Sequence, residues 1–157
     1  MPIATVMQTT HSVECVYTVP ATTLAVTVLF WCVPALVLIA LALPDTRGVI
    51  CGARWVLFFL KRTVAREGIF VSRDVAVQLH GTSLLGTSVY HTCVDMRILS
   101  GVFLNEGFLR HAVTYYLCVV HEVPTTKERR VDVVFRDAMP RLAELKEVYR
   151  KVLTVLG

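Results

Sequence analysis

Two pairs of histidine and cysteine side chains are the residues of this sequence whose types could support chemistry. His91 stands two positions before Cys93, and Cys118 stands three positions before His121. Such side chains are common zinc ligands, and a Cys–His pair can act as a nucleophile with its base. Residues three apart on a strand point to opposite faces, however, so Cys118 and His121 are poorly placed to bind one ion together. We therefore expect no metal ligand and no catalytic residue here, and interpret these positions as ordinary strand residues.

Phosphate-binding loops and paired catalytic acids are not recognisable elsewhere in the sequence. The Gly81–Ser88 segment, expected as a surface connection between two strands, has glycines and hydroxyls, but it lacks the Lys-Ser/Thr ending and the following helix of a phosphate loop. The chain has no Asp-x-Asp motif and no two glutamates separated by seven residues. Lys127, Arg129 and Arg130 could contact anionic head groups or a sugar nucleotide, although a solvated loop is the simpler interpretation. We expect no bound cofactor and no nucleic-acid partner.

Apolar residues are concentrated in the N-terminal part of the chain. Of the 157 residues 55% are apolar, and the mean hydropathy of +0.61 exceeds that of an ordinary soluble domain. No charged residue occurs between 21 and 43, whereas almost all Lys, Arg, Asp and Glu follow Pro44. Five cysteines, spread over both parts, do not form a disulfide framework. The sequence thus predicts a membrane anchor followed by one domain, which is too small for two nucleotide-binding halves.

Residues 21–62 form the expected anchor, after an N-terminal segment at 1–20. As a helix, residues 21–43 would be about 34 Å long, enough to cross a hydrocarbon core of about 30 Å. Residues 49–60 form a shorter apolar stretch that contains Arg54, so we expect an interfacial helix or the shorter arm of a hairpin. An amphipathic connector packed on the domain is the alternative. A cleavable signal peptide is disfavoured because residues 1–20 lack Lys and Arg. Basic residues follow the span and none precede it, which predicts a cytosolic C-terminal domain. These residues are Arg47, Arg54, Lys61, Arg62 and Arg66.

Residues 67–157 show a pattern of antiparallel strands followed by one helix. Strands are expected at 69–71, 75–80, 89–94, 98–104, 111–120 and 130–135. Asn105-Glu106-Gly107 is expected as a turn. An apolar stripe at three- and four-residue spacing predicts a closing helix, with Asp137 as its cap and Pro140 in its first turn. The stripe consists of Leu142, Leu145, Tyr149, Val152 and Leu156. The expected fold class is therefore α+β, a pleckstrin-homology-like antiparallel sheet or barrel with a C-terminal helix behind the transmembrane anchor.

Four motifs in the domain resemble one known family. They are Val75–Leu79, Leu104–Gly107 with Val113–Leu117, Val133–Phe135, and Met139–Leu142 with Glu147–Arg150. Their order and spacing are similar to those of the PIG-H family of phosphatidylinositol N-acetylglucosaminyltransferase subunits, over about residues 67–156. In that family the domain follows two hydrophobic segments arranged as a hairpin, whereas here the second segment is short and contains Arg54.

The resemblance implies a subunit of an endoplasmic-reticulum complex that transfers N-acetylglucosamine from UDP-N-acetylglucosamine to phosphatidylinositol, the first step of GPI-anchor biosynthesis. It implies that another subunit is the catalyst, and that the partners are this catalytic glycosyltransferase, multispanning membrane subunits and the lipid bilayer. The candidate partner-binding residues come from the motifs. They are Asn105, Glu106, Tyr115, Tyr116, Phe135, Pro140, Arg141, Leu142, Tyr149 and Arg150.

Two other functional classes remain open from the sequence. A membrane-tethered lipid- or peptide-binding adaptor could have the same pleckstrin-homology-like sheet. Such an adaptor should carry a basic pocket between its first strands, where this sequence offers only Arg73 and His80. A small membrane enzyme is the third class, and it lacks a convergent set of catalytic side chains.

Overall fold

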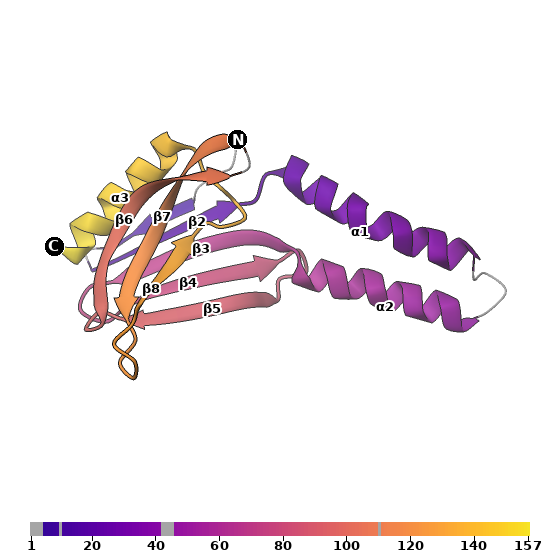
Figure 1. Cartoon of the computed structure of the whole chain (residues 1–157), viewed down its shortest axis with the longest axis horizontal. Helices are drawn as coiled ribbons and strands as arrows, with labels where there is room; N and C mark the ends of the chain where they lie inside the picture. The colour runs from indigo at the N-terminus through magenta and orange to yellow at the C-terminus, as the bar shows by residue number, and fades with distance from the viewer. Residues whose placement is uncertain (1–4, 10, 42–45, 110) are drawn as a thin grey trace.

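The computed structural model describes residues 5–9, 11–41, 46–109 and 111–157. Its elements, in chain order, are β1 (Thr5–Gln8), β2 (Ser12–Thr18), α1 (Ala21–Leu41), α2 (Thr46–Arg62), β3 (Val64–Ser72), β4 (Ala76–Ser83), β5 (Ser88–Asp95), β6 (Leu99–Leu109), β7 (Ala112–Glu122), β8 (Arg129–Val134) and α3 (Leu142–Leu156) (Figure 1).

The strands form two antiparallel sheets. The first has the order β1-β2-β3-β4-β5, and the second has the order β6-β7-β8. In Figure 1 the second sheet crosses the first, and α3 lies along the sheets at the end of the molecule away from α1 and α2. The expected combination of antiparallel strands and a C-terminal helix is therefore confirmed. Of the two forms considered, the described strands make open sheets and not a closed barrel.

The core lies between the two sheets and α3. Alternation in β2 points Val13, Cys15 and Tyr17 inward, while the residues between them are partly exposed. Helical spacing in α3 gives a buried stripe of Leu145, Val148, Val152 and Val155, which packs against strands of both sheets. The stripe was predicted, but Val148 and Val155 lie at its centre, whereas the predicted Tyr149 and Leu156 lie at its edge.

β2 joins the N-terminal segment to the domain. Its residues pair with β3 from Ser12 opposite Ser72 to Thr18 opposite Arg66. The chain leaves the sheet after β2, forms α1 and α2, and returns as the neighbouring strand β3. The amide of Val19 donates to the carbonyl of Ala65 across 2.9 Å, so the exit and the return are side by side. The two helices are thus an insertion between adjacent strands of one sheet.

α1 and α2 form a helical hairpin that projects from the domain (Figure 1). Trp31 of α1 stacks on Phe59 of α2 with ring centroids 4.4 Å apart, and Gly52 of α2 is buried. Residues 49–60 lie within α2, and residues 42 and 43 of the expected span lie outside the described residues. Within the part of the chain that is described, no helix has the combined length and hydropathy needed to cross a membrane.

Three local expectations were wrong. Asn105-Glu106-Gly107 is not a turn but the middle of β6, where each residue pairs with one of Thr114–Tyr116 on β7. Gly81–Ser83 belong to β4, so the connection to β5 is confined to 84–87. α3 begins at Leu142, after Asp137 and Pro140, and Arg141 is its N-cap, with the Arg141 amide donating to Glu144 Oε2 (3.1 Å). The six strands expected within residues 67–157 are present as β3 to β8, and the described residues before α1 form two further strands, β1 and β2.

Candidate functional site

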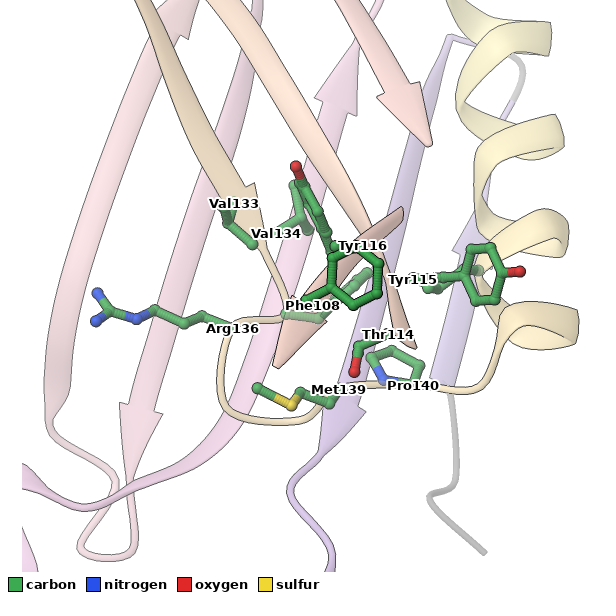
Figure 2. Close-up of a pocket in the computed structure, with 12 residues that line it drawn as sticks. Phe108, Thr114, Tyr115, Tyr116, Val133, Val134, Arg136, Met139 and Pro140 are labelled. Carbon is green, nitrogen blue, oxygen red and sulfur yellow. The ribbon is translucent and has the colours of Figure 1, made fainter. Parts of the chain in front are cut away.

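An apolar pocket lies at one end of the second sheet, beside the segment that joins β8 to α3. We call residues 135–141 the β8–α3 loop. The pocket is lined by Gly107 and Phe108 of β6, Thr114, Tyr115 and Tyr116 of β7, Val133 and Val134 of β8, Phe135, Arg136, Met139 and Pro140 of the loop, and Leu145 of α3 (Figure 2). Its volume is about 190 Å³. Small-molecule sites usually measure roughly 300–1,000 Å³, so this pocket better suits one or two inserted side chains.

The rim of this pocket exposes large apolar side chains. Phe108 is 87% exposed and Met139 is 47% exposed. Tyr115 is also exposed and points toward α3 (Figure 2). Arg136 and Arg141 are exposed at the same end of the sheet, as is Glu106. Clustered apolar groups beside charged groups are typical of surfaces that bind other proteins.

The β8–α3 loop has a strained conformation. Phe135 and Met139 have φ values of 57° and 42°, in the left-handed region that non-glycine residues rarely adopt. The amide of Met139 donates to the carbonyl of Phe135 across 3.1 Å. The ring of Phe135 meets that of Tyr17 edge-on at 4.7 Å, which anchors the loop to β2.

Glu67 of β3 holds this loop in place. Its side chain is buried, with 1% exposed. Glu67 Oε2 accepts the amides of Asp137 (2.9 Å) and Ala138 (2.8 Å), and Glu67 Oε1 accepts the hydroxyl of Tyr90 (2.7 Å). A buried carboxylate is costly unless it accepts several hydrogen bonds, and these contacts meet that need. Glu67 therefore connects the first sheet to the wall of the pocket.

Gly81 allows Tyr90 to reach Glu67. The three residues lie in one row across β3, β4 and β5, with Glu67 opposite Gly81 and Gly81 opposite Tyr90. A Cβ atom on Gly81 would lie 2.3 Å from the Tyr90 ring, so only glycine leaves room for the ring to cross. Burial, and then the hydrogen bond to Glu67, raise the pKa of Tyr90 above its ordinary value. Tyr90 consequently remains a hydrogen-bond donor at neutral pH.

The predicted site residues fall into three groups. Tyr115, Tyr116, Phe135 and Pro140 line the pocket. Asn105 and Glu106 pair with Tyr116 and Tyr115 in the β6–β7 ladder. Arg141, Leu142, Tyr149 and Arg150 lie at the start of α3 and along it.

Phe108, Met139 and Glu67 were missed by the sequence reasoning. Phe108 follows the segment that was expected as a turn, and Met139 lies in the loop that was expected as a helix start. A single acidic residue within an apolar strand was the available signal for Glu67.

The histidine and cysteine pairs lie apart in the structure. His91 and Cys93 are on β5 of the first sheet, and Cys118 and His121 are on β7 of the second. Cys118 is buried, which raises the pKa of its thiol, and Asn105 Nδ2 donates to its sulfur across 3.6 Å. His121 Nδ1 lies 3.6 Å from Asp132 Oδ2. No group of three or more His, Cys, Asp and Glu residues that could hold a metal ion occurs among the described residues.

The strands that build the pocket coincide with a region that is similar to known proteins. Residues 68–136 match the family described as "GPI-GlcNAc transferase complex, PIG-H component". The chain is 30% identical over 101 residues to phosphatidylinositol N-acetylglucosaminyltransferase subunit gpi15 of Schizosaccharomyces pombe, with 64% of this chain and 61% of the relative aligned.

Two mammalian relatives have similar alignments. Identity to the H subunit of phosphatidylinositol N-acetylglucosaminyltransferase from Mus musculus is 30% over 110 residues, covering 69% of this chain and 57% of the relative. Identity to the corresponding Homo sapiens protein is 28% over 103 residues, covering 64% of this chain and 53% of the relative. The alignments thus span about half to three fifths of the relatives' length. The strands from β3 to β8, at residues 68–136, belong to the PIG-H family.

Proposed function

We propose that this chain is a non-catalytic subunit of the complex that transfers N-acetylglucosamine from UDP-N-acetylglucosamine to phosphatidylinositol in GPI-anchor biosynthesis. The observation that carries the proposal is the match of residues 68–136 to the PIG-H component. The names of the yeast and mammalian relatives support it, since each is a subunit of a phosphatidylinositol N-acetylglucosaminyltransferase. The chain's role is to bind the catalytic glycosyltransferase and the multispanning subunits and to hold them at the membrane.

The domain serves this role as a pleckstrin-homology-like scaffold. Four strands, β2 to β5, lie in one sheet, three strands, β6 to β8, lie in the other, and α3 closes the domain. This sequence of elements supports the pleckstrin-homology-like assignment. The α1–α2 hairpin is inserted between its first two strands, and β1 extends the first sheet.

The α1–α2 hairpin is the anchor, inserted in the membrane of the endoplasmic reticulum with the domain in the cytosol. Two observations support this proposal: the absence of charged residues from 21 to 43, and the exposed apolar side chains on both helices, including Phe30 and Phe58. Lys61, Arg62 and Arg66 cluster at the domain end of the hairpin, as expected for the cytosolic side. Because β2 and β3 are paired, both arms begin at that side, and the strands before α1 are cytosolic too.

The pocket beside the β8–α3 loop is the proposed contact for another subunit. An apolar side chain of that subunit fills the pocket and packs on Phe108 and Met139, while charged groups contact Arg136 and Arg141 around it. Aromatic side chains at the centre of an interface usually contribute most of its affinity, and arginines at its rim contribute less. Phe108 should therefore contribute more to the affinity for the other subunit than Arg141.

The test is affinity purification of the tagged full chain from mild detergent. The wild-type chain should recover a glycosyltransferase and multispanning subunits. Phe108→Ser should reduce this recovery tenfold or more, as expected for about 1.4 kcal/mol or more of lost binding free energy, without changing thermal unfolding. Val131→Ser is the matched control, because Val131 is also exposed (56%) but does not line the pocket. Recovery of soluble signalling proteins in place of the transferase would contradict the proposed function.

Catalysis is tested separately with the purified chain. We expect no transfer of N-acetylglucosamine to phosphatidylinositol by this chain alone, and transfer when the whole complex is present. Turnover by the isolated chain would contradict the non-catalytic role.

A further inference from the structure

A second cavity lies where the α1–α2 hairpin joins the domain. Its volume is about 300 Å³. It is lined by Val19, by Thr23, Leu24, Thr27 and Trp31 of α1, by Phe59 and Arg62 of α2, and by Thr63, Val64 and Asp137. Polar and apolar side chains therefore share one cavity, and the two helices supply both kinds.

The polar groups of this cavity suit a phosphodiester with a hydroxylated head. Arg62 is exposed, and none of the ion pairs among the described residues includes it. Its guanidinium can bind a phosphate in a bidentate manner. Asp137 is exposed in the same cavity and can accept hydrogen bonds from head-group hydroxyls, while its charge disfavours a doubly charged phosphate monoester.

The apolar groups suit a hydrocarbon chain beside that phosphate. Phe59 precedes Arg62 by one helical turn and stacks on Trp31, so the apolar wall continues from Arg62 along the hairpin. Lys61 and Arg66 are exposed near the same end and add positive charge. A ligand that satisfies all these groups has an anionic phosphodiester at one end and an acyl chain at the other.

We infer that this cavity binds one anionic phospholipid with a hydroxylated head group, with its phosphate on Arg62 and an acyl chain against Trp31 and Phe59. The inference rests on the proposed membrane insertion of the hairpin. It adds to the proposed function a lipid-binding site on this subunit, at the place where the anchor joins the domain.

The experiment uses Trp31 as a reporter of the lipid beside it. The chain has two tryptophans, so a Trp55→Phe background leaves Trp31 alone. The full chain is placed in phosphatidylcholine nanodiscs that contain a minority of phosphatidylglycerol, and either lipid is supplied with brominated acyl chains, which quench tryptophan fluorescence. Brominated phosphatidylglycerol should quench Trp31 more than the same fraction of brominated phosphatidylcholine, and more than brominated phosphatidic acid.

Arg62→Gln should lower this preference about tenfold, the low end of what is expected for one charge-assisted contact. Arg62→Lys should retain most of it. Lys61→Gln is the matched control, because Lys61 is the adjacent exposed cation but lines a different groove, on the outer face of α2. Equal losses with Arg62→Gln and Lys61→Gln would show only general attraction to an anionic surface and would overturn the site.

Three further results would overturn the inference in distinguishable ways. Equal quenching by all three brominated lipids would contradict the lipid site but leave the proposed anchor intact. Absence of quenching by any of them would contradict the anchor itself, and the site with it. Relief of the quenching by inorganic phosphate would show that the cavity takes free phosphate and not a lipid.

Discussion

Leu145 in α3 and Leu29 in α1 occupy opposite surroundings in the same chain. Leu145 is fully buried where α3 packs on the two sheets, whereas Leu29 is 66% exposed. Phe30 and Phe58 of the hairpin are exposed like Leu29, and Val148 and Val152 of α3 are buried like Leu145. The domain provides its own apolar environment. The hairpin exposes the same residue types on its surface.

The difference extends to the pattern of each helix. In α3 the apolar residues form one stripe and the other face carries Lys146, Glu147 and Arg150, as expected for a helix on a soluble core. α1 has no polar face, because its only polar side chains are threonines near its start and one cysteine. Burying one leucine side chain stabilises a protein by about 1.5–3 kcal/mol. A helix whose apolar side chains are exposed is therefore stabilised by an apolar environment that the domain does not supply. This contrast motivates the membrane proposal and can be tested with matched substitutions.

The largest effect is expected from Leu145→Asp. The substitution would bury an unpaired charge, costing several kcal/mol against a total domain stability of about 5–15 kcal/mol. Cooperative thermal unfolding of the detergent-solubilised chain should largely disappear. Leu153→Asp is the control on the same helix, because Leu153 is 42% exposed and should tolerate the charge. Similar melting curves for the wild type and Leu145→Asp would show that α3 does not pack as described.

Charges on the hairpin should weaken its retention in the membrane and leave the stability of the domain unchanged. Leu29→Asp combined with Val33→Asp places two charges on exposed positions of α1, each costing about 2.5–3.5 kcal/mol in a bilayer. The wild-type chain should stay in the membrane pellet after alkaline carbonate extraction, and the double variant should be partly released. Its domain should melt like the wild type, since neither side chain is in the core. Retention of the double variant, or release of the wild type, would count against the proposed anchor.

An intermediate effect is expected at the buried link between the two sheets. Glu67→Gln keeps the side-chain shape but replaces an acceptor oxygen with a donor, which should cost about 1–3 kcal/mol. Tyr90→Phe removes one of the three hydrogen bonds and should cost about 1 kcal/mol. Because the two residues share a bond, the double variant should lose less than the sum. Urea unfolding measures all three, and the exposed Glu106→Gln is the control.

Strands and helices with a clear period were predictable from the sequence. The α3 stripe and the strand at 130–135 have periods close to 3.6 and 2, and both lie near the expected positions. β2 also alternates, but its seven residues precede a long apolar run, and they pair with residues of β3 that lie 48 to 60 positions away in sequence. Local patterns do not report such distant pairing.

The wrong turn at 105–107 has a specific physical cause. Asn, Glu and Gly suit a turn locally, yet Gly107 lies opposite Thr114 in the ladder, and a Cβ there would be 3.0 Å from the ring of Tyr116. The glycine makes room for an aromatic neighbour within a strand. The pocket was missed for a related reason, since its walls come from three strands, a loop and a helix that only the tertiary fold brings together.

The smallest effect is expected for Cys15, which tests whether β2 belongs to the core. Burial raises the pKa of its thiol from its ordinary value near 9 to about 11. The folded state thus favours the protonated thiol, so its contribution to stability is complete below pH 9 and is lost as the pH rises through 11. By about pH 10 the loss should reach on the order of 1 kcal/mol.

Urea unfolding from about pH 8 to pH 10 measures this dependence, and Cys15→Ala should reduce it. Part of the loss of stability at high pH should remain in Cys15→Ala, because burial also raises the pKa values of Tyr17 and Tyr90. Thiol labelling gives a second readout at neutral pH. Exposed Cys93 should react with a maleimide in the native state, and buried Cys15 should react only after unfolding. Equal labelling of the two cysteines would mean that β2 is not part of the sheet, and both ends of the hairpin would then no longer be fixed to one side of the membrane.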